Sequence, residues 1–321
     1  MTLSNTEQIY RLVAISKLYY EEGLSQQQIS EKIHIHRTEI SRLLKEAKKI
    51  GIVQTIVKVP SNPHTEEMAN FLRKNFSLKD AVVVPTKTNE SYQENLRSLS
   101  LYANEMINHY LEDNSVVGLS WGKTLENVIS SFYTTKKYTN IQIVPLIGGP
   151  LGQLDISCQA NSLVAKLSNK IANSRISTLD SPAFISSSLA RKEILETQNN
   201  RNTVNLWENV SLAVVGIGSA KDVDNKNWQE FYNKKGVAEI YHKSMVGDIL
   251  SQAYSITGNE YQETYPNLVG MELKKLREVK TTIAIATGEK KIDAILGGLR
   301  AKVFNVLITT DTVAQSIKSQ M

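Results

Sequence analysis

The sequence predicts an α/β protein with two domains, a small helical domain at the N-terminus and a larger Rossmann-like domain after it. Between residues 9 and 50 the apolar residues recur at spacings of three and four, which indicates amphipathic helices. From residue 80 onwards, short apolar strands alternate with helical stretches. This alternation is typical of a mainly parallel sheet that helices cover on both faces.

The length of the chain and one proline-containing segment set the predicted domain boundary. The chain has 321 residues, whereas an ordinary domain has ~100–200. Pro60 and Pro63 stand between the two patterns, and we expect a stiff linker there because proline cannot continue a strand. The predicted domains therefore span 1–59 and 60–321.

The N-terminal domain is predicted to contain three helices and a short strand. The helices span 9–20, 26–33 and 37–49. The second begins with a capping box formed by Ser25 and Gln28. The segment IVQTIVKV that follows Gly51 is predicted to be a strand, which would form the wing of a winged helix-turn-helix.

Two histidines depart from the usual helix-turn-helix pattern. His34 occupies the turn position where glycine commonly supplies a positive φ, although histidine tolerates that region better than most residues. His36 stands where an N-capping serine is expected, and it could contact DNA instead.

The helix over 37–49 is the predicted recognition helix, because the second helix of this motif lies in the DNA major groove. Arginine can form bidentate bonds to guanine, and Ser, Thr and Lys suit phosphate oxygens and base edges. A solvated amphipathic helix is the alternative, but three helices in this order around a short turn favour DNA binding. The predicted DNA contacts are Gln26, Gln27, His36, Arg37, Thr38, Glu39, Ser41, Arg42 and Lys45.

Positive charge is concentrated at the N-terminal end of the chain. The net charge is +5, and residues 1–58 hold nine Lys and Arg against six Asp and Glu, a balance of +3. This distribution suits a polyanionic partner such as double-stranded DNA.

Seven strands are predicted in the larger domain, over 81–85, 115–120, 141–147, 175–179, 210–218, 281–287 and 304–310. Helices over 93–111, 125–133 and 158–172 lie between some of them. Ligands bind beyond the carboxyl ends of the strands in such sheets, and several glycine-containing loops fall there.

The loop GLSWGKTL, from Gly118 to Leu125, is the strongest candidate for a phosphate site. It leaves a strand and enters a helix, so backbone N–H groups, two hydroxyls and a helix N-terminus are available to an anion. It is not a P-loop, because three residues separate its glycines where that motif has four. We therefore reject ATP or GTP hydrolysis.

Three further loops and one aspartate extend the candidate site. The loops contain Gly148 and Gly149, Gly216 and Gly218, and Gly288 to Lys291; Asp248 could accept hydrogen bonds from sugar hydroxyls. Each glycine alone could reflect turn geometry only, but several in one parallel sheet favour a binding site. Among the tryptophans, Trp121 is the one expected to meet a ligand.

Other classes of protein find little support in the sequence. The histidines show no metal-ligand spacing, and zinc, nucleophile-elbow and G-x-G-x-x-G motifs are absent from the sequence. The single cysteine, Cys158, fits a reducing cytosol. The sequence has no secretory h-region and no apolar run of the ~18 residues that a membrane span needs. We expect a cytoplasmic protein with no metal, no cofactor and no catalytic residues.

These motifs occur together in a known family. The chain resembles the SorC family of bacterial sugar-responsive transcriptional regulators over nearly its whole length, in KLYYEEGLSQQQISEKI, HRTEISRLLKEAKKIGIV, FSLKDAVV, GLSWGKTL, IVPLIGGPLGQL, AVVGIGS and VGDIL. The resemblance implies a winged helix-turn-helix followed by an effector domain like the sugar-phosphate isomerases and deaminases. It also implies dimers and tetramers on paired operator sites of a carbohydrate operon of the sorbose or sorbitol type.

The loops and the resemblance together give a predicted effector site for a sugar phosphate or sugar. Some relatives offer a lysine just before the paired glycines that could form a Schiff base, but here Ile147 holds that place, so we expect non-covalent binding. The alternative function is a sugar-phosphate isomerase or deaminase, which would need a general acid and base near the sugar carbonyl. The predicted effector-binding residues are Gly118, Ser120, Trp121, Gly122, Lys123, Thr124, Gly148, Gly149, Gly216, Gly218, Asp248, Gly288 and Lys291.

Overall fold

A computed structural model of the chain describes residues 5–53, 61–86, 91–150, 155–221, 244–261 and 267–321. The chain divides into two compact units, 1–57 and 58–321. The predicted boundary stands at 59/60. Most of the predicted wing strand, Ile52 to Val59, lies outside the described residues.

The smaller unit contains the three predicted helices. They are α1 (Asn5–Tyr20), α2 (Gln26–Ile33) and α3 (Arg37–Lys49), and the predicted bounds of the second and third are confirmed. The buried residues that hold them together are Leu12, Ile15, Ile29, Ile40, Leu43, Leu44 and Ala47.

The local signals between these helices are also confirmed. The Ser25 hydroxyl accepts from the Gln28 N–H at 3.2 Å, and the Gln28 side chain accepts from the Ser25 N–H at 2.9 Å. His34 lies in the left-handed region, with φ 54° and ψ 44°, and thereby ends α2. His36 is the N-cap residue of α3 but makes no side-chain cap bond. The tight turn is thus built without the usual glycine and serine.

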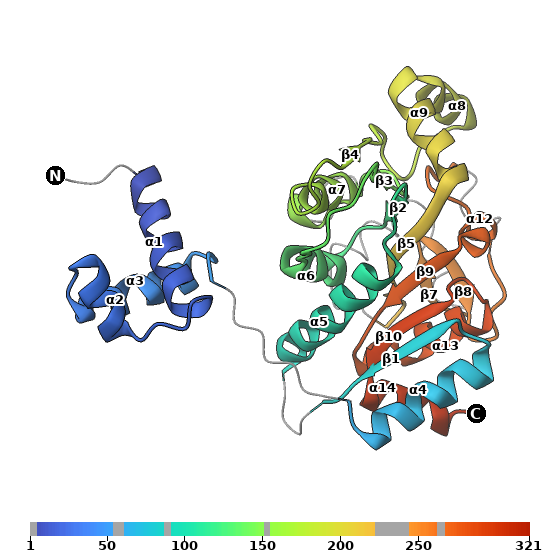
Figure 1. Cartoon of the computed structure of the whole chain (residues 1–321). Coiled ribbons are helices and arrows are strands. Elements are labelled where there is room, and N and C mark those ends of the chain that lie inside the picture. The colour runs from blue at the N-terminus through green and yellow to red at the C-terminus, as the bar shows by residue number, and fades with distance from the viewer. Residues whose placement is uncertain (1–4, 54–60, 87–90, 151–154, 222–243, 262–266) are drawn as a thin grey trace. The chain divides into compact units, whose positions relative to one another are not determined.

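The larger unit is built on a seven-stranded parallel sheet, so the predicted fold class is confirmed (Figure 1). The strand order is β1-β10-β9-β5-β2-β3-β4. The strands are β1 (Asp80–Val84), β2 (Val116–Leu119), β3 (Gln142–Pro145), β4 (Arg175–Ile176), β5 (Val210–Gly216), β9 (Thr281–Ile285) and β10 (Val306–Thr310).

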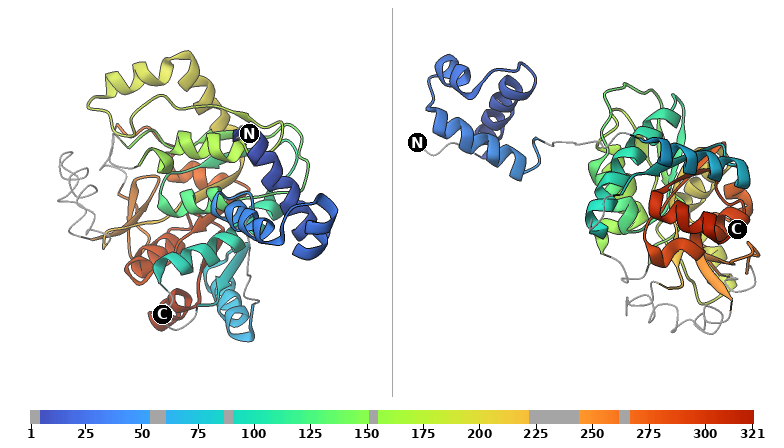
Figure 2. Two further views of the ribbon diagram at one scale, coloured as in Figure 1. Left: turned by 90° about the vertical axis from the view of Figure 1, so that its left-hand side faces the viewer. Right: turned by 90° about the horizontal axis from the view of Figure 1, so that it is seen from below.

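Helices cover both faces of this sheet (Figure 1). One face carries α5 (Tyr92–Tyr110), α6 (Lys123–Ser131) and α7 (Ala160–Ser168). The other carries α4 (Pro63–Phe76), α12 (Leu273–Glu278), α13 (Ile292–Arg300) and α14 (Asp311–Ser319). The pair α8 (Ser188–Glu196) and α9 (Gln198–Leu206) projects from this unit in Figure 1 and in the left view of Figure 2.

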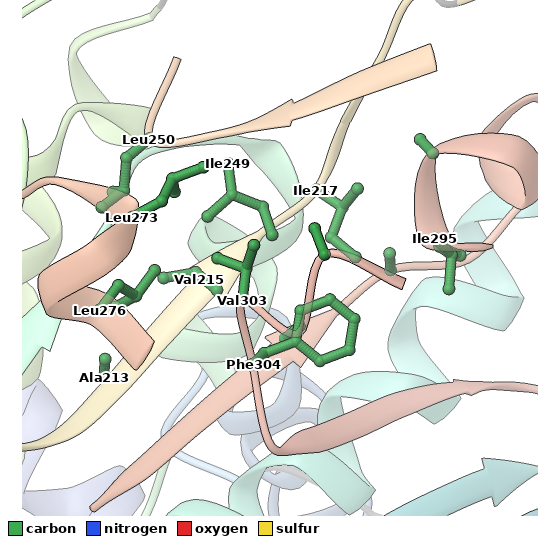
Figure 3. Packing of buried hydrophobic residues seen from close by; sticks show 14 of the residues in the cluster. Ala213, Val215, Ile217, Ile249, Leu250, Leu273, Leu276, Ile295, Val303 and Phe304 are labelled. Atoms are coloured by element: carbon green, nitrogen blue, oxygen red, sulfur yellow. The ribbon is translucent and has the colours of Figure 1, made fainter. Parts of the chain in front are cut away.

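Alternation along β5 shows why this strand is apolar throughout. Leu212 and Val214 belong to the core under α5, α6 and α7. Ala213 and Val215 point to the opposite face, where Figure 3 shows them near Ile249 and two leucines of α12. A strand buried on both faces needs apolar residues at successive positions, which is the pattern that predicted it.

The structure corrects three sequence predictions. The strand predicted over 175–179 is only two residues long, and that over 210–218 ends at Gly216. Pro63 is the first residue of α4, not part of a linker, because Asn62 caps that helix and proline is tolerated in the first turn.

A small antiparallel sheet was missed altogether. It consists of β6 (Gly218–Ser219), β7 (Met245–Ile249) and β8 (Gln252–Ser255). Leu250 and Ser251 join β7 to β8, and both have positive φ, at 52° and 57°. Two-residue hairpin turns usually contain glycine, asparagine or aspartate. Because this turn contains none of them, the sequence did not predict the hairpin.

Truncation of Ile40 tests the core of the smaller unit. Ile40 is fully buried, so Ile40→Ala is expected to destabilise this unit by roughly 2–5 kcal/mol. Thermal unfolding followed by circular dichroism measures the change. The control is Ile50→Ala, because Ile50 is 53% exposed. Equal losses in the two variants would contradict this packing.

Candidate functional site

The outer surface of α3 carries the cations that the sequence assigned to DNA. Its inner side is apolar and buried, whereas Arg37, Thr38, Arg42 and Lys45 are exposed and Ser41 is half-buried. His36 and Gln27 are also exposed, and Gln26 is half-buried. Gln27 donates to Glu31 at 2.9 Å within α2. The basic face of α3 is therefore free of core contacts.

Glu39 has a structural role that the sequence analysis did not assign. The Arg11 guanidinium of α1 donates to its carboxylate at 2.8 Å, and both side chains are partly buried. Glu46 lies two turns further along α3. One of its carboxylate oxygens accepts from the Gln8 side chain of α1 at 2.9 Å, and the other lies 3.6 Å from Arg42. The two carboxylates thus hold α1 against α3.

The larger unit has a topological switch point between β2 and β5. From β2 the chain continues to β3 and β4 on one side, and from β5 it continues to β9 and β10 on the other. Leu119 at the end of β2 pairs with Val214 of β5. Loops that leave such neighbouring strands part in opposite directions, so the edge beyond them is the usual ligand site of parallel sheets.

Ser120 fastens the two loops at this point. Its buried hydroxyl accepts from the Gly216 N–H at 3.1 Å, and its own N–H donates to the Val214 carbonyl at 3.2 Å. The predicted loops that contain Ser120 and Gly216 are thereby brought together.

Gly122 sets the start of α6. Its φ of 125° is one that side-chain-bearing residues rarely adopt, and its N–H donates to the Cys158 carbonyl at 2.9 Å. Lys123 and Thr124 are the next residues of α6, where backbone N–H groups have no acceptor within the helix. The positive end of the helix dipole therefore lies directly after the β2 loop.

Asp248 pairs with the short strand β6, and Lys291 contacts the residue just before that strand. A Cβ atom on Gly218 would come within 2.0 Å of an Asp248 carboxylate oxygen, so only glycine permits this approach. The buried carboxylate accepts from the Ser251 N–H at 3.2 Å, and the Lys291 ammonium donates to the Ile217 carbonyl at 2.6 Å. One anionic and one cationic predicted residue thus share this part of the edge.

The paired glycines have backbone partners of their own. Gly148 donates to the Val269 carbonyl at 2.9 Å and Gly149 to the Ser181 carbonyl at 2.7 Å. A Cβ on Gly148 would meet two carbonyl oxygens at 2.7 Å, so close packing explains this glycine. Ile147, which precedes the paired glycines, is 1% exposed. Residues 151–154 of the same loop lie outside the described residues.

Two other predicted residues pack within the protein. Trp121 is 9% exposed and belongs to the core on the α4 side of the sheet. Gly118 packs against the Leu146 side chain, because a Cβ atom on Gly118 would be only 2.4–2.9 Å from Leu146 atoms.

Tyr92 is a residue of this edge that the sequence analysis missed. It is the first residue of α5, and its ring lies against Gly288, the predicted residue at the end of β9. Its position follows from tertiary packing, so spacing along the chain gave no signal for it.

Ion pairing and burial shift the pKa values of three side chains in the larger unit. Burial raises the pKa of Glu126, but hydrogen bonds from Lys166 and Ser130 outweigh burial and lower it below its usual value. Burial raises the pKa of the Cys158 thiol. Burial, followed by the charge of Asp248, raises the pKa of Tyr254 well above its usual value.

The described part of the chain offers no metal-binding group of three or more His, Cys, Asp or Glu side chains. His34 and His36 lie in the smaller unit, His64 lies in α4 and His109 in the last turn of α5, while His242 is outside the described residues. No helix within the described ranges is long and apolar enough to cross a membrane.

Comparison with known proteins identifies the family. Residues 62–318 match the family described as "Putative sugar-binding domain". The chain is 30% identical to the sorbitol operon regulator of Klebsiella pneumoniae over 98% of this chain and 99% of that protein. The chain belongs to the SorC family of sugar-binding transcriptional regulators.

Solved structures of SorC-family proteins agree with this assignment. The full-length Klebsiella pneumoniae SorC structure matches with a TM-score of 0.74 over 98% of this chain and 99% of that one. The probable sor operon regulator from Shigella flexneri is 28% identical and matches with a TM-score of 0.71, over 79% of this chain and 98% of that one.

A deoxyribonucleoside regulator of Bacillus subtilis is also similar in sequence, 26% identical over 96% of this chain and 97% of that protein.

The paired glycines offer a matched test of packing. Gly148→Ala is expected to destabilise the larger unit by roughly 1–3 kcal/mol, because the added methyl group meets backbone carbonyls. Gly149→Ala is the control, since its nearest neighbour would be 3.7 Å away. Thermal unfolding compares the two. Similar melting temperatures for both variants would show that Gly148 is not closely packed.

Proposed function

We propose that this protein regulates a carbohydrate operon of the sorbose or sorbitol type by binding operator DNA through α3. A sugar phosphate or sugar at the carboxyl edge of the large sheet controls the operator affinity. The observation that carries the proposal is the combination, in one chain, of an exposed basic recognition helix and glycine-rich loops at the switch point between β2 and β5.

The chemistry of α3 supports DNA as the partner. Arg37, Arg42 and Lys45 are exposed on one helix, whereas Glu39 and Glu46 are engaged by side chains of α1. The acidic residues of the helix are thus directed to the α1 interface, which favours contact of the basic face with phosphates and base edges.

The loops at the switch point support an anionic sugar as the effector. The first N–H groups of α6 favour a phosphate, and Lys291 adds a positive charge at the same edge. Asp248 supplies acceptors that suit sugar hydroxyls. Because Ile147 is apolar and buried, we propose non-covalent binding without a cofactor.

Control of DNA binding requires two states of the protein that differ in effector affinity. We propose that dimers and tetramers provide these states and that each assembly occupies paired operator sites. Because operator DNA is an intracellular partner, we place the protein in the cytoplasm.

Sugar-phosphate isomerase or deaminase activity is the rival function, and the geometry gives it little support. Such an enzyme needs a positioned acid and base near the sugar carbonyl. Asp248 is at the proposed site, but the four described histidines lie elsewhere in the fold. Turnover of ketose or aldose phosphates by the purified protein would overturn the proposal of a regulator without catalytic activity.

Arg42 tests the DNA-binding half of the proposal. Arg42→Ala is expected to weaken binding to a duplex from the upstream region of the operon by roughly 1–3 kcal/mol, the contribution of one bidentate base contact. Fluorescence anisotropy at fixed salt measures the affinity. Lys192→Ala, on exposed helix α8, is the control and should leave the affinity unchanged. Equal affinities for wild type and Arg42→Ala would remove Arg42 from the interface.

Lys291 tests the effector half. Lys291→Met removes a charged donor beside the switch point, so sugar-phosphate affinity should fall by roughly 1.5–3 kcal/mol. Isothermal titration calorimetry measures this loss. Lys137→Met is the control, because Lys137 is exposed in the connection from α6 to β3, at the opposite edge of the sheet. An unchanged affinity in Lys291→Met would contradict the assigned site.

A further inference from the structure

The position of Tyr92 is fixed by the start of α5. Ser91 caps this helix: its hydroxyl accepts from the Glu94 N–H at 3.3 Å, and its N–H donates to the Glu94 carboxylate at 2.8 Å. Tyr92 is therefore the first helical residue, with its backbone held by a capping box. Because α5 follows the parallel strand β1, its N-terminus lies at the carboxyl edge of the sheet.

The ring of Tyr92 lies on the loop that leaves β9. A Cβ atom built on Gly288 would be 3.5 Å from Tyr92 Cε2 and 3.8 Å from Cδ2, which is ordinary van der Waals contact. Gly288 has φ 105° and begins the turn that leads to Lys291. Tyr92 remains 47% exposed, so the part of its side chain away from Gly288 is accessible.

Tyr92 also lies on the same side of the sheet as the start of α6. Helices α5 and α6 pack against each other over one face (Figure 1). The strands beneath them are adjacent, in the order β9-β5-β2. A ligand with its phosphate at the first turn of α6 would therefore extend over the ends of β5 and β9 towards Gly288 and the tyrosine ring.

We propose that Tyr92 forms the sugar-facing wall of the effector site and helps to select among sugar phosphates. This inference rests on the proposed function. An aromatic ring offers an apolar surface to the C–H groups of a sugar, and its hydroxyl can donate to or accept from a sugar hydroxyl. Tyr92 carries no positive charge to attract a phosphate, which distinguishes it from Lys291 and the start of α6.

The test compares two ligand classes on three variants of the full chain. Wild type, Tyr92→Ala, Tyr92→Phe and the control Tyr133→Ala are titrated calorimetrically with sorbitol 6-phosphate, sorbose 1-phosphate, fructose 6-phosphate and inorganic phosphate. Tyr133 is 54% exposed and follows α6, at the opposite edge of the sheet. Thermal unfolding of each variant checks that the fold is intact.

In Tyr92→Ala, the dissociation constant of the best sugar phosphate should rise about tenfold relative to that of inorganic phosphate. Tyr92→Phe should show a smaller rise, and Tyr133→Ala none. A parallel loss for sugar phosphate and inorganic phosphate, or no loss for the sugar phosphate, overturns the inference. Failure of the wild-type chain to bind any of the sugar phosphates would instead overturn the proposed effector, and this inference with it.

Discussion

The pairing of β2 with β5 is the constraint on which the larger unit depends. These strands are neighbours in the sheet, but the chain reaches β5 only after it has formed β3 and β4. Their loops must therefore diverge to opposite faces, and the Ser120 hydroxyl joins them through the Gly216 N–H. The start of α6, the strand β6 and the Lys291 turn are all placed at one edge by this arrangement.

The glycines at this edge serve different purposes. Gly148 and Gly218 are required by close contacts with carbonyl oxygens and with the Asp248 carboxylate. Gly122 and Gly288 are required by positive φ at the starts of two helical turns. The first pair permits close packing, and the second pair permits the backbone to turn into α6 and the Lys291 turn. A sequence motif that contains glycine does not separate these two uses.

The sequence was sufficient where local interactions determine structure. The capping box of Ser25 and Gln28 located α2 to the residue, and the double-sided apolar pattern of β5 predicted a buried parallel strand. The sequence did not predict contacts between residues that are far apart along the chain. Glu39 was predicted to contact DNA, and its ion-pair partner Arg11, 28 positions away in the sequence, was not foreseen. Tyr92 likewise contacts Gly288, which lies almost two hundred residues later in the chain.

We propose that this one chain couples the binding of a sugar phosphate to operator affinity. The most direct measurement is anisotropy of a labelled upstream duplex with the full chain, titrated with the three sugar phosphates and with free sorbose and sorbitol. We predict that one compound changes the operator dissociation constant by roughly 5–150-fold, the usual range of coupling between two sites. Tight duplex binding that none of these compounds alters would contradict the coupling, and no duplex binding at low salt would contradict the regulator itself.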